Sequence, residues 1–305
     1  MIEDWQQELR RYHSPFVKDL VWAILSPQLM INPGEQPDNT AQFYSHAYRS
    51  IQSQLQALDK DDTQLADYLQ QGNDKRLGAH FERLWQFWLQ LTPLYDCLGQ
   101  NIQLNETSRT TNKTTNKTIG EFDLIVRNNQ TQGIEHWELA IKFYLGIAEL
   151  PENNNWFGTN RRDRLDLKQS KLMEKQLQLT STEAAQCFFA ERGWEVNRVR
   201  LISKGCLFNP ICAALPPPQL VNPQHLQGQW LTHDQFLNLE QQLGEHQFAI
   251  LDKSQWISMG SKNLLSYQQM AVKIRKEPPQ HPVQLSMETP NLEHHRIFLT
   301  PPQWN

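Results

Sequence analysis

Two neighbouring segments in the middle of the chain alternate between polar and apolar residues with the period of a β-strand. In residues 120–126, Asp123 lies on a polar face and apolar residues occupy the opposite face. In residues 136–142, Glu138 and Lys142 share a polar face that is again backed by apolar residues. The alternation predicts two adjacent strands of a half-buried sheet, joined by the short polar turn between them. Each strand would bury one face in a core and present the other to a site.

The polar faces of these strands carry the residue types that metal-dependent hydrolysis requires. Carboxylate oxygens are the ligands that Mg²⁺ and Mn²⁺ prefer, and a bound ion activates water and stabilises charge on a phosphoryl group. We therefore expect Asp123 and Glu138 to bind the ion, and Glu121 to add a direct or water-mediated contact. Lys142 would orient the attacking water or neutralise developing negative charge. This combination is typical of phosphodiester cleavage.

A third acidic position lies on a helix that the sequence predicts upstream. Apolar residues at helical spacing define this helix over residues 77–89, and Glu82 lies at the border of its apolar stripe. A solvated charge is the ordinary role of such a residue. Because two polar strand faces follow, Glu82 is also a candidate member of the same catalytic site.

These residues together resemble a known group of enzymes. The Gly-Glu-Phe-Asp segment, the acid and lysine of the next strand and the glutamate of the preceding helix are similar to the core of the PD-(D/E)xK nuclease superfamily. The chain as a whole resembles an uncharacterised bacterial family placed in that superfamily, through residues 16–22, 120–123, 137–145 and 162–168. The resemblance implies an α/β, restriction-endonuclease-like core with the element order α-β-β-β-α-β. It also implies a Mg²⁺- or Mn²⁺-dependent nuclease that acts on DNA, with RNA as the second choice.

One position departs from the superfamily pattern. The pattern has its second acid two residues before the lysine, where this chain has Ala140. The nearest acid on the same face is Glu138, one strand repeat or roughly 6.5–7 Å earlier. Two interpretations follow: the carboxylate has migrated and the site is active, or the site has decayed and the fold binds a nucleic acid or a protein without turnover.

A basic segment follows the two strands. Asn160 predicts a helix start, and the sequence indicates a helix over residues 161–177 with basic residues along one side. A solvated helix face is the usual reading of such a run. In the nuclease interpretation it binds the substrate backbone, through Arg161, Arg164, Lys168, Lys171 and Gln176.

Turn-forming and apolar patterns divide the chain into three parts. Residues 1–72 predict a helical N-terminal region, and residues 73–215 contain the nuclease-like core. Residues 216–305 predict an α/β annex packed on that core, beginning at a run of three prolines. A repeated Thr-Asn-Lys motif within residues 110–118 predicts a surface hairpin tip.

Composition restricts where the chain works and what it binds. No apolar run reaches about 18 residues, so we expect no membrane span. The first residues are acidic and polar, and the four cysteines form no C-x-x-C pair, which favours the cytoplasm. Because the formal net charge is −4, any contact with a nucleic acid must come from a local basic patch. The sequence leaves the oligomeric state and the cleavage specificity open.

Overall fold

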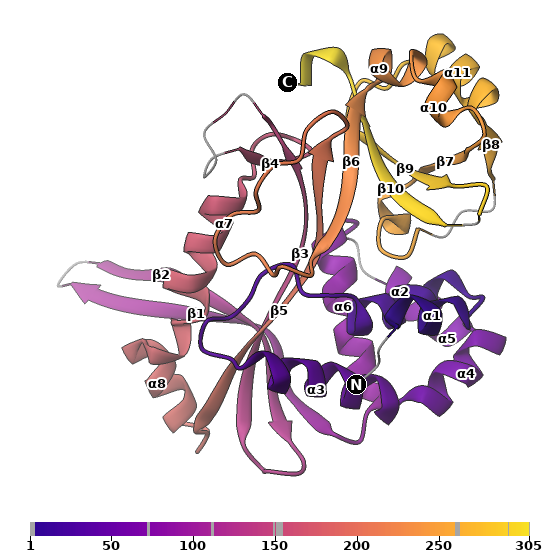
Figure 1. Ribbon diagram of the computed structural model, residues 1–305. Helices are drawn as coiled ribbons and strands as arrows, with labels where there is room; N and C mark the ends of the chain where they lie inside the picture. Colours follow the sequence, from indigo (N-terminus) through magenta and orange to yellow (C-terminus); the bar gives the residue numbers. More distant parts are fainter. Residues whose placement is uncertain are drawn as a thin grey trace. The chain divides into compact units, whose positions relative to one another are not determined.

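The computed structural model describes residues 4–71, 74–110, 113–148, 150, 155–259, 263–291 and 293–304, which form a mixed α/β chain (Figure 1). Contacts between residues divide the chain into two compact units. The first unit contains Met1–Ser26, Met30–Ile141 and Lys168–Ser203. The second unit contains Pro27–Leu29, Lys142–Leu167 and Lys204–Asn305.

A ten-stranded mixed sheet organises the described residues. Its hydrogen-bonded order is β1-β2-β3-β5-β6-β10-β9-β7-β8, and β4 pairs with β3. The pairs β1–β2 and β2–β3 are antiparallel, whereas β5–β6 and β6–β10 are parallel. The strands are β1 (Tyr95–Thr110), β2 (Lys113–Asn128), β3 (Ile134–Gly146), β4 (Trp156–Gly158), β5 (Val196–Pro210), β6 (Leu226–Thr232), β7 (Gln247–Leu251), β8 (Leu265–Ser266), β9 (Val283–Glu288) and β10 (His294–Thr300).

Helices precede the sheet and are inserted between its strands. The N-terminal helices are α1 (Trp5–Arg10), α2 (Pro15–Leu25), α3 (Pro37–Ser50), α4 (Gln52–Lys60), α5 (Thr63–Gln70) and α6 (Leu77–Leu91). The later helices are α7 (Leu165–Lys171), the π-helix η2 (Leu172–Gln176), η3 (Leu179–Ser181), α8 (Glu183–Ala190), α9 (His233–Leu237), α10 (Glu240–Leu243), η4 (Lys253–Gln255), α11 (Tyr267–Lys276) and η5 (Pro302–Trp304). None of the helices among the described residues is long and apolar enough to cross a membrane.

An aromatic cluster fixes α6 against β3 in the first unit. The indole of Trp137 lies 5.9 Å from the rings of both Trp85 and Trp88, and 4.8 Å from that of Tyr95, measured between centroids. Most of these contacts have the edge-to-face or tilted geometry that aromatic pairs prefer. These contacts bury Trp137 completely between β3 and α6.

The two segments of alternating residues form neighbouring strands, as predicted. In the β2–β3 pair, Leu124 lies opposite Trp137 and Arg127 lies opposite Ile134. The amide of Asn128 donates to the carbonyl of Gly133, at 2.9 Å, and closes the turn between them. This turn sets the register of the pair, and the register decides which polar residues meet.

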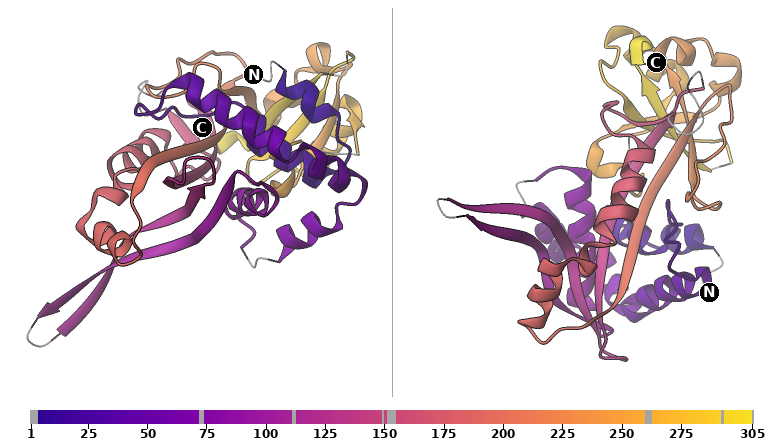
Figure 2. Two further views of the ribbon diagram at one scale, coloured as in Figure 1. Left: turned by 90° about the horizontal axis from the view of Figure 1, so that it is seen from below. Right: turned by 90° about the vertical axis from the view of Figure 1, so that its left-hand side faces the viewer.

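Residues 101–106 have the apolar alternation of a short strand, and the strand in the structure is longer. β1 pairs with β2 from Tyr95↔Asn128 to Thr110↔Lys113, and the two continue as a two-stranded ribbon (Figure 2). The Thr-Asn-Lys repeat falls at the end of this ribbon, and residues 111–112 lie outside the described residues.

The prediction of a helix over residues 161–177 was wrong about where the helix begins. Arg161 has a φ of 59°, which is outside the right-handed helical region. The amide of Arg161 donates to the carbonyl of Gly158, and the amide of Gly158 donates to the carbonyl of Asp163, both at 2.8 Å. These bonds form a tight turn, so the helix begins only at α7. A π-helical turn, η2, then replaces the last predicted α-helical residues.

The second unit has a core of its own. Its buried cluster joins β6, β7, β9 and β10 to the helices α9, α10 and α11, with Phe236, Phe248, Tyr267 and Leu285 near its centre. Residues 256–257 are apolar and suggest strand from the sequence, but they follow η4 as a turn. The capping box at Asp252 and Gln255 starts that short helix and explains the difference.

Candidate functional site: an acidic cluster on β2 and β3

Asp123 and Glu138 lie on the neighbouring strands β2 and β3. The ladder between these strands runs from Arg127↔Ile134 to Leu124↔Trp137, so Asp123 and Glu138 are the next residue of each strand beyond it. The backbone amide of Leu139 donates to Oδ2 of Asp123 at 2.7 Å, which ties the aspartate to β3.

Glu138 is the buried member of this pair, with 1% of its surface exposed. Its Oε1 accepts a hydrogen bond from Nε2 of Gln176. Its Oε2 is also buried but has no hydrogen-bond partner among the described residues. A buried carboxylate oxygen without a partner is costly unless a proton or a cation compensates it.

Gln176 reaches Glu138 from the end of the π-helix η2. The amide of Leu177 donates to the carbonyl of Leu172 at 2.9 Å, a bond that spans five residues and defines the π turn. Nζ of Lys168, on α7, donates to Oε1 of Gln176 at 3.1 Å. Lys168, Gln176 and Glu138 therefore form a continuous chain of hydrogen bonds.

Glu82 contributes a third carboxylate from α6. It is half-buried, beside the buried Phe81 and Leu84 of the same helix. Burial, together with the charges of Asp123 and Glu121, raises the pKa of Glu82 to about 7. These charges act on Glu82 because the acids of α6 and β2 lie close to one another, although Glu121 itself is exposed.

The strand acids show the same electrostatic pattern. Burial raises the pKa of Asp123 to about 6, against the opposing effects of the Leu139 amide and the charge of Lys168. Burial also raises the pKa of Glu138 well above its ordinary range, reinforced by the charge of Asp123 and opposed by Lys168 and Lys171. Three carboxyl groups thus resist ionisation together, and two lysines of α7 partly compensate them.

Lys142 has a different partner from the one expected. Its Nζ donates to the carboxylate of Asp163, and both side chains are about one-third exposed, at 31% and 34%. The hydroxyl of Tyr144 donates to the other Asp163 oxygen at 3.4 Å. The sequence interpretation placed Asp163 in a helix cap three residues after Asn160, whereas the turn at Arg161 brings it to β3. The catalytic role of Lys142 stays a prediction.

The two arginines predicted to bind substrate make contacts within the second unit. Nη1 of Arg161 donates to the carbonyl of Trp304 at 2.5 Å, and the guanidinium lies over the rings of Phe157 and Trp304. Arg164 forms a bidentate contact with Asp166. Lys171 is exposed on α7 and lies close enough to lower the pKa of both strand acids.

The acidic cluster has fewer candidate ligands close together than a metal site in which every ligand is a protein side chain. In the part of the chain that the structure describes, no group of three or more His, Cys, Asp or Glu residues could hold a metal ion. Mg²⁺, however, is commonly bound through only one or two carboxylates, with water and substrate phosphates completing its shell. Asp123 and Glu138 are two carboxylates on neighbouring strands, which is the smaller number.

His136 is a buried site residue whose environment the sequence did not reveal. It lies on β3 two residues before Glu138, fully buried, with its ring 4.9 Å from that of Phe122. Neither ring nitrogen has a hydrogen-bond partner among the described residues. Burial lowers the pKa of His136 to about 4, so it is neutral near pH 7. The alternation of residues 136–142 predicted that His136 lies on the polar face of the strand. Only its packing against Phe122 shows that this part of the face is buried.

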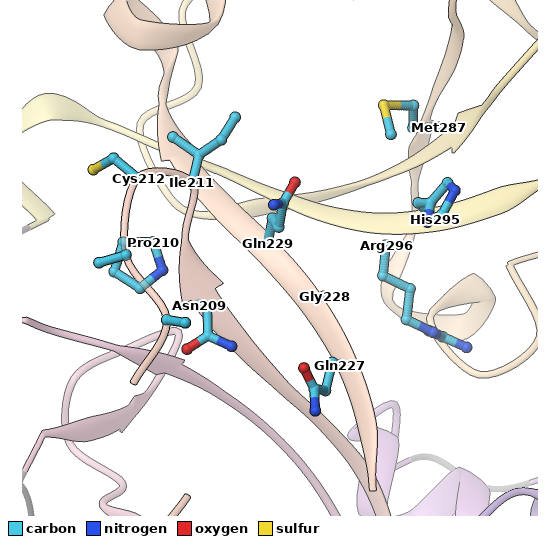
Figure 3. Close-up of a pocket in the computed structure, with 12 residues that line it drawn as sticks. Asn209, Pro210, Ile211, Cys212, Gln227, Gly228, Gln229, Met287, His295 and Arg296 are labelled. Carbon is cyan, nitrogen blue, oxygen red and sulfur yellow. The ribbon is translucent and has the colours of Figure 1, made fainter. Parts of the chain in front are cut away.

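The second unit contains a separate cavity of about 620 Å³ (Figure 3). Gln227 and Gln229 line it from β6, together with His295 from β10. Other polar groups near it are used within the fold. Asn209 accepts a hydrogen bond from the Leu215 amide at 2.8 Å, and the Arg296 guanidinium donates to the carbonyls of residues 256 and 257. The cavity lacks the clustered acids of the β2–β3 site.

The fold and the site define a mixed α/β protein with an acidic cluster on two central strands. The model of a family described as a domain of unknown function, DUF1853, matches residues 18–300, and the chain belongs to this family. No curated protein matches the chain, and no solved structure matches it.

Proposed function

We propose that this protein is a Mg²⁺- or Mn²⁺-dependent phosphodiester hydrolase that acts on nucleic acid, with DNA as the favoured substrate. The observation that carries the proposal is the buried Oε2 of Glu138, which has no hydrogen-bond partner among the described residues and lies on the strand next to that of Asp123. Such an oxygen needs a proton or a cation, and the lysines nearby leave its pKa raised rather than lowered. A divalent ion would satisfy it.

The donor set fits a hard divalent ion. Asp123 and Glu138 would hold it, and Glu82 or Glu121 would add a direct or water-mediated contact. When bound, the ion would lower the pKa of a coordinated water and stabilise negative charge on the phosphoryl oxygens. Oxygen-only ligands favour Mg²⁺ or Mn²⁺ over zinc.

The protein's own residues would position the substrate and balance its charge. Lys171 is exposed on α7 and near the acids, so it can contact a phosphate without giving up an internal ion pair. The element order α6-β1-β2-β3-α7-β5 supports a restriction-endonuclease-like core, with β4 as an addition. It also supports the resemblance to the PD-(D/E)xK nucleases.

A second function is favoured by the partner of Lys142. If the acidic cluster does not bind a metal ion, the chain would bind nucleic acid or another protein without turnover. The pairing of Lys142 with Asp163 favours this alternative, because it removes the strand lysine from the role that the nuclease pattern gives it.

Calorimetric titration with Mn²⁺ and a cleavage assay with Mg²⁺ or Mn²⁺ distinguish the two. We expect the wild type to bind the ion and to cut DNA, and Asp123→Asn to lose both properties. Glu195→Gln, which changes an exposed acid outside the cluster, is the matched control and should retain both. A wild type that binds DNA but cuts no single-stranded, duplex or branched substrate would establish the binding function instead.

A further inference from the structure

Two lysines are candidates for the positively charged group of the acidic cluster. Lys142, on β3, is held by Asp163. Lys168, on α7, donates to Gln176, which in turn donates to Glu138. Lys168 is therefore joined to the buried carboxylate by an unbroken chain of contacts.

We propose that Lys168 is the positioning lysine of this cluster, and that it acts through Gln176 to orient Glu138. The inference rests on the proposed metal-dependent function and deepens it. The sequence pattern assigns the positively charged group of the site to Lys142 on β3, and this inference assigns it to Lys168 on α7. In this arrangement, Oε1 of Glu138 is held by the glutamine, and Oε2 is left for the ion.

The chemistry of a side-chain amide explains why the lysine is needed. One end of Gln176 donates hydrogen bonds and the other accepts them, and the two ends can exchange by rotation. A lysine ammonium group can only donate, so Lys168 holds the carbonyl end of Gln176 toward itself. The NH₂ end must then point to Glu138. Without Lys168, the amide could turn its oxygen toward the carboxylate, and that contact would be repulsive.

Other charged groups around Glu138 do not provide this orientation. Glu82 on α6 and Asp123 on β2 are acids that raise its pKa, and Lys171 acts on it only through its charge. Lys175 lies exposed on η2, one residue before Gln176, and has no part in the chain of hydrogen bonds. It is therefore a suitable control for a loss of charge at this end of the helix.

The test is the Mn²⁺ affinity of a matched set of full-length variants, measured by calorimetry. We expect Lys168→Met and Gln176→Leu each to weaken binding about 10- to 100-fold, the usual cost of losing a partner that orients a metal ligand. The double variant should bind Mn²⁺ no more weakly than the single variant with the lower affinity, because both changes break the same chain of contacts. Lys168→Arg, which can still donate to the glutamine, should restore most of the affinity. Lys175→Met should bind as the wild type does.

Each alternative result has a distinct meaning. Wild-type affinity in Lys168→Met, or losses that multiply in the double variant, would overturn the inference while leaving the proposed function intact. The same holds if Lys142→Met loses affinity and Lys168→Met retains it. A wild type that binds no Mn²⁺ would overturn the proposed function itself. Near-ultraviolet circular dichroism of each variant, with Lys168→Arg as the conservative change, separates a lost contact from a lost fold.

Discussion

At the scale of single residues, the first unit contains buried polar groups of two kinds. Arg200 is 2% exposed and has charged partners: it pairs with Glu35 at 2.6 Å, contacts Glu135 and lies over the ring of Phe43. His136 is equally buried, and neither of its ring nitrogens has a hydrogen-bond partner among the described residues. Opposite charges offset part of the desolvation cost in a buried ion pair, whereas burial of an imidazole without a partner favours its neutral form.

His136 should make the protein sensitive to mild acid. Its pKa is lowered to about 4 by burial, so between roughly pH 6.5 and 4 the unfolded chain takes up a proton that the folded chain refuses. Stability is therefore present above this range and lost as the pH falls, by up to about 3 kcal/mol. We expect His136→Leu to lose less stability than the wild type between pH 7.5 and 4.5 in urea unfolding. Equal losses in the two proteins would contradict this account.

Glu82 should have the opposite dependence on pH. Its pKa is raised to about 7, so the folded protein keeps a proton that the unfolded chain has already released. Stability from this group is complete below pH 4.5 and is lost as the pH rises through 7. We expect metal-free Glu82→Gln to be more stable than the wild type at pH 8 by about 1–2 kcal/mol, after allowance for solvent screening. The difference should disappear near pH 5. A constant difference across this range would show that the glutamine changes packing and not charge.

The sequence predicted the residues of the cluster better than their partners. Period-two alternation was enough to put Asp123 and Glu138 on polar faces of neighbouring strands. It could not show that Asp123 accepts a hydrogen bond from the backbone amide of Leu139, the residue after Glu138. The partner of Lys142 is 21 residues away and depends on the backbone of Arg161. A residue with positive φ, such as Arg161, cannot be recognised from a hydrophobic pattern. The pairing of Asp163 with Lys142 could therefore not be predicted from the sequence.

At the scale of elements, β3 and β5 approach so closely that one position excludes every side chain. Gly205 of β5 has a φ of 144°, and a Cβ atom built there would lie 1.8 Å from the carbonyl oxygen of Lys142. Such a distance is far below van der Waals contact, and the obstacle is backbone, which cannot rotate away. Glycine at 205 therefore permits the close approach of the two strands in the second unit.

Gly205→Ala should be among the most damaging small substitutions in this chain. The added methyl group combines a backbone clash with an unfavourable φ, and we expect a loss of about 3 kcal/mol or more in the free energy of unfolding. Gly193→Ala is the matched control, since its φ of 62° is also left-handed but no atom lies within 4 Å. It should cost only about 1–2 kcal/mol. Denaturant unfolding of both variants measures the difference, and similar costs would show that the strands can separate.

At the scale of the whole molecule, the two units share their central strands. β3 and β5 each begin in the first unit and end in the second. The family match over residues 18–300 likewise extends through both units. The boundary predicted at the three prolines separates the later strands from β5, although β6 pairs with residues 206–210 of that strand. The sequence could locate a turn there, but it could not show that the sheet continues across it.

A fragment of residues 216–305 tests that boundary. It contains every buried residue of the cluster around Phe236 and Leu285, so we expect cooperative unfolding on heating. It lacks β5, so the edge of β6 that normally pairs with residues 206–210 is exposed, and we expect concentration-dependent self-association. Circular dichroism and sedimentation velocity provide the two measurements. A fragment without a melting transition would show that these residues depend on the rest of the sheet for their fold.

The π turn in η2 has a consequence for comparing relatives of this chain. A π turn holds one residue more than the α-helical turn it replaces, and here that residue belongs to the segment that ends at Gln176. A family member shorter by one position in this segment would form an ordinary helix and turn a different side chain toward its counterpart of Glu138. The number of residues in this segment can be read from a sequence. It would therefore distinguish relatives that retain the lysine–glutamine contact from those that have lost it.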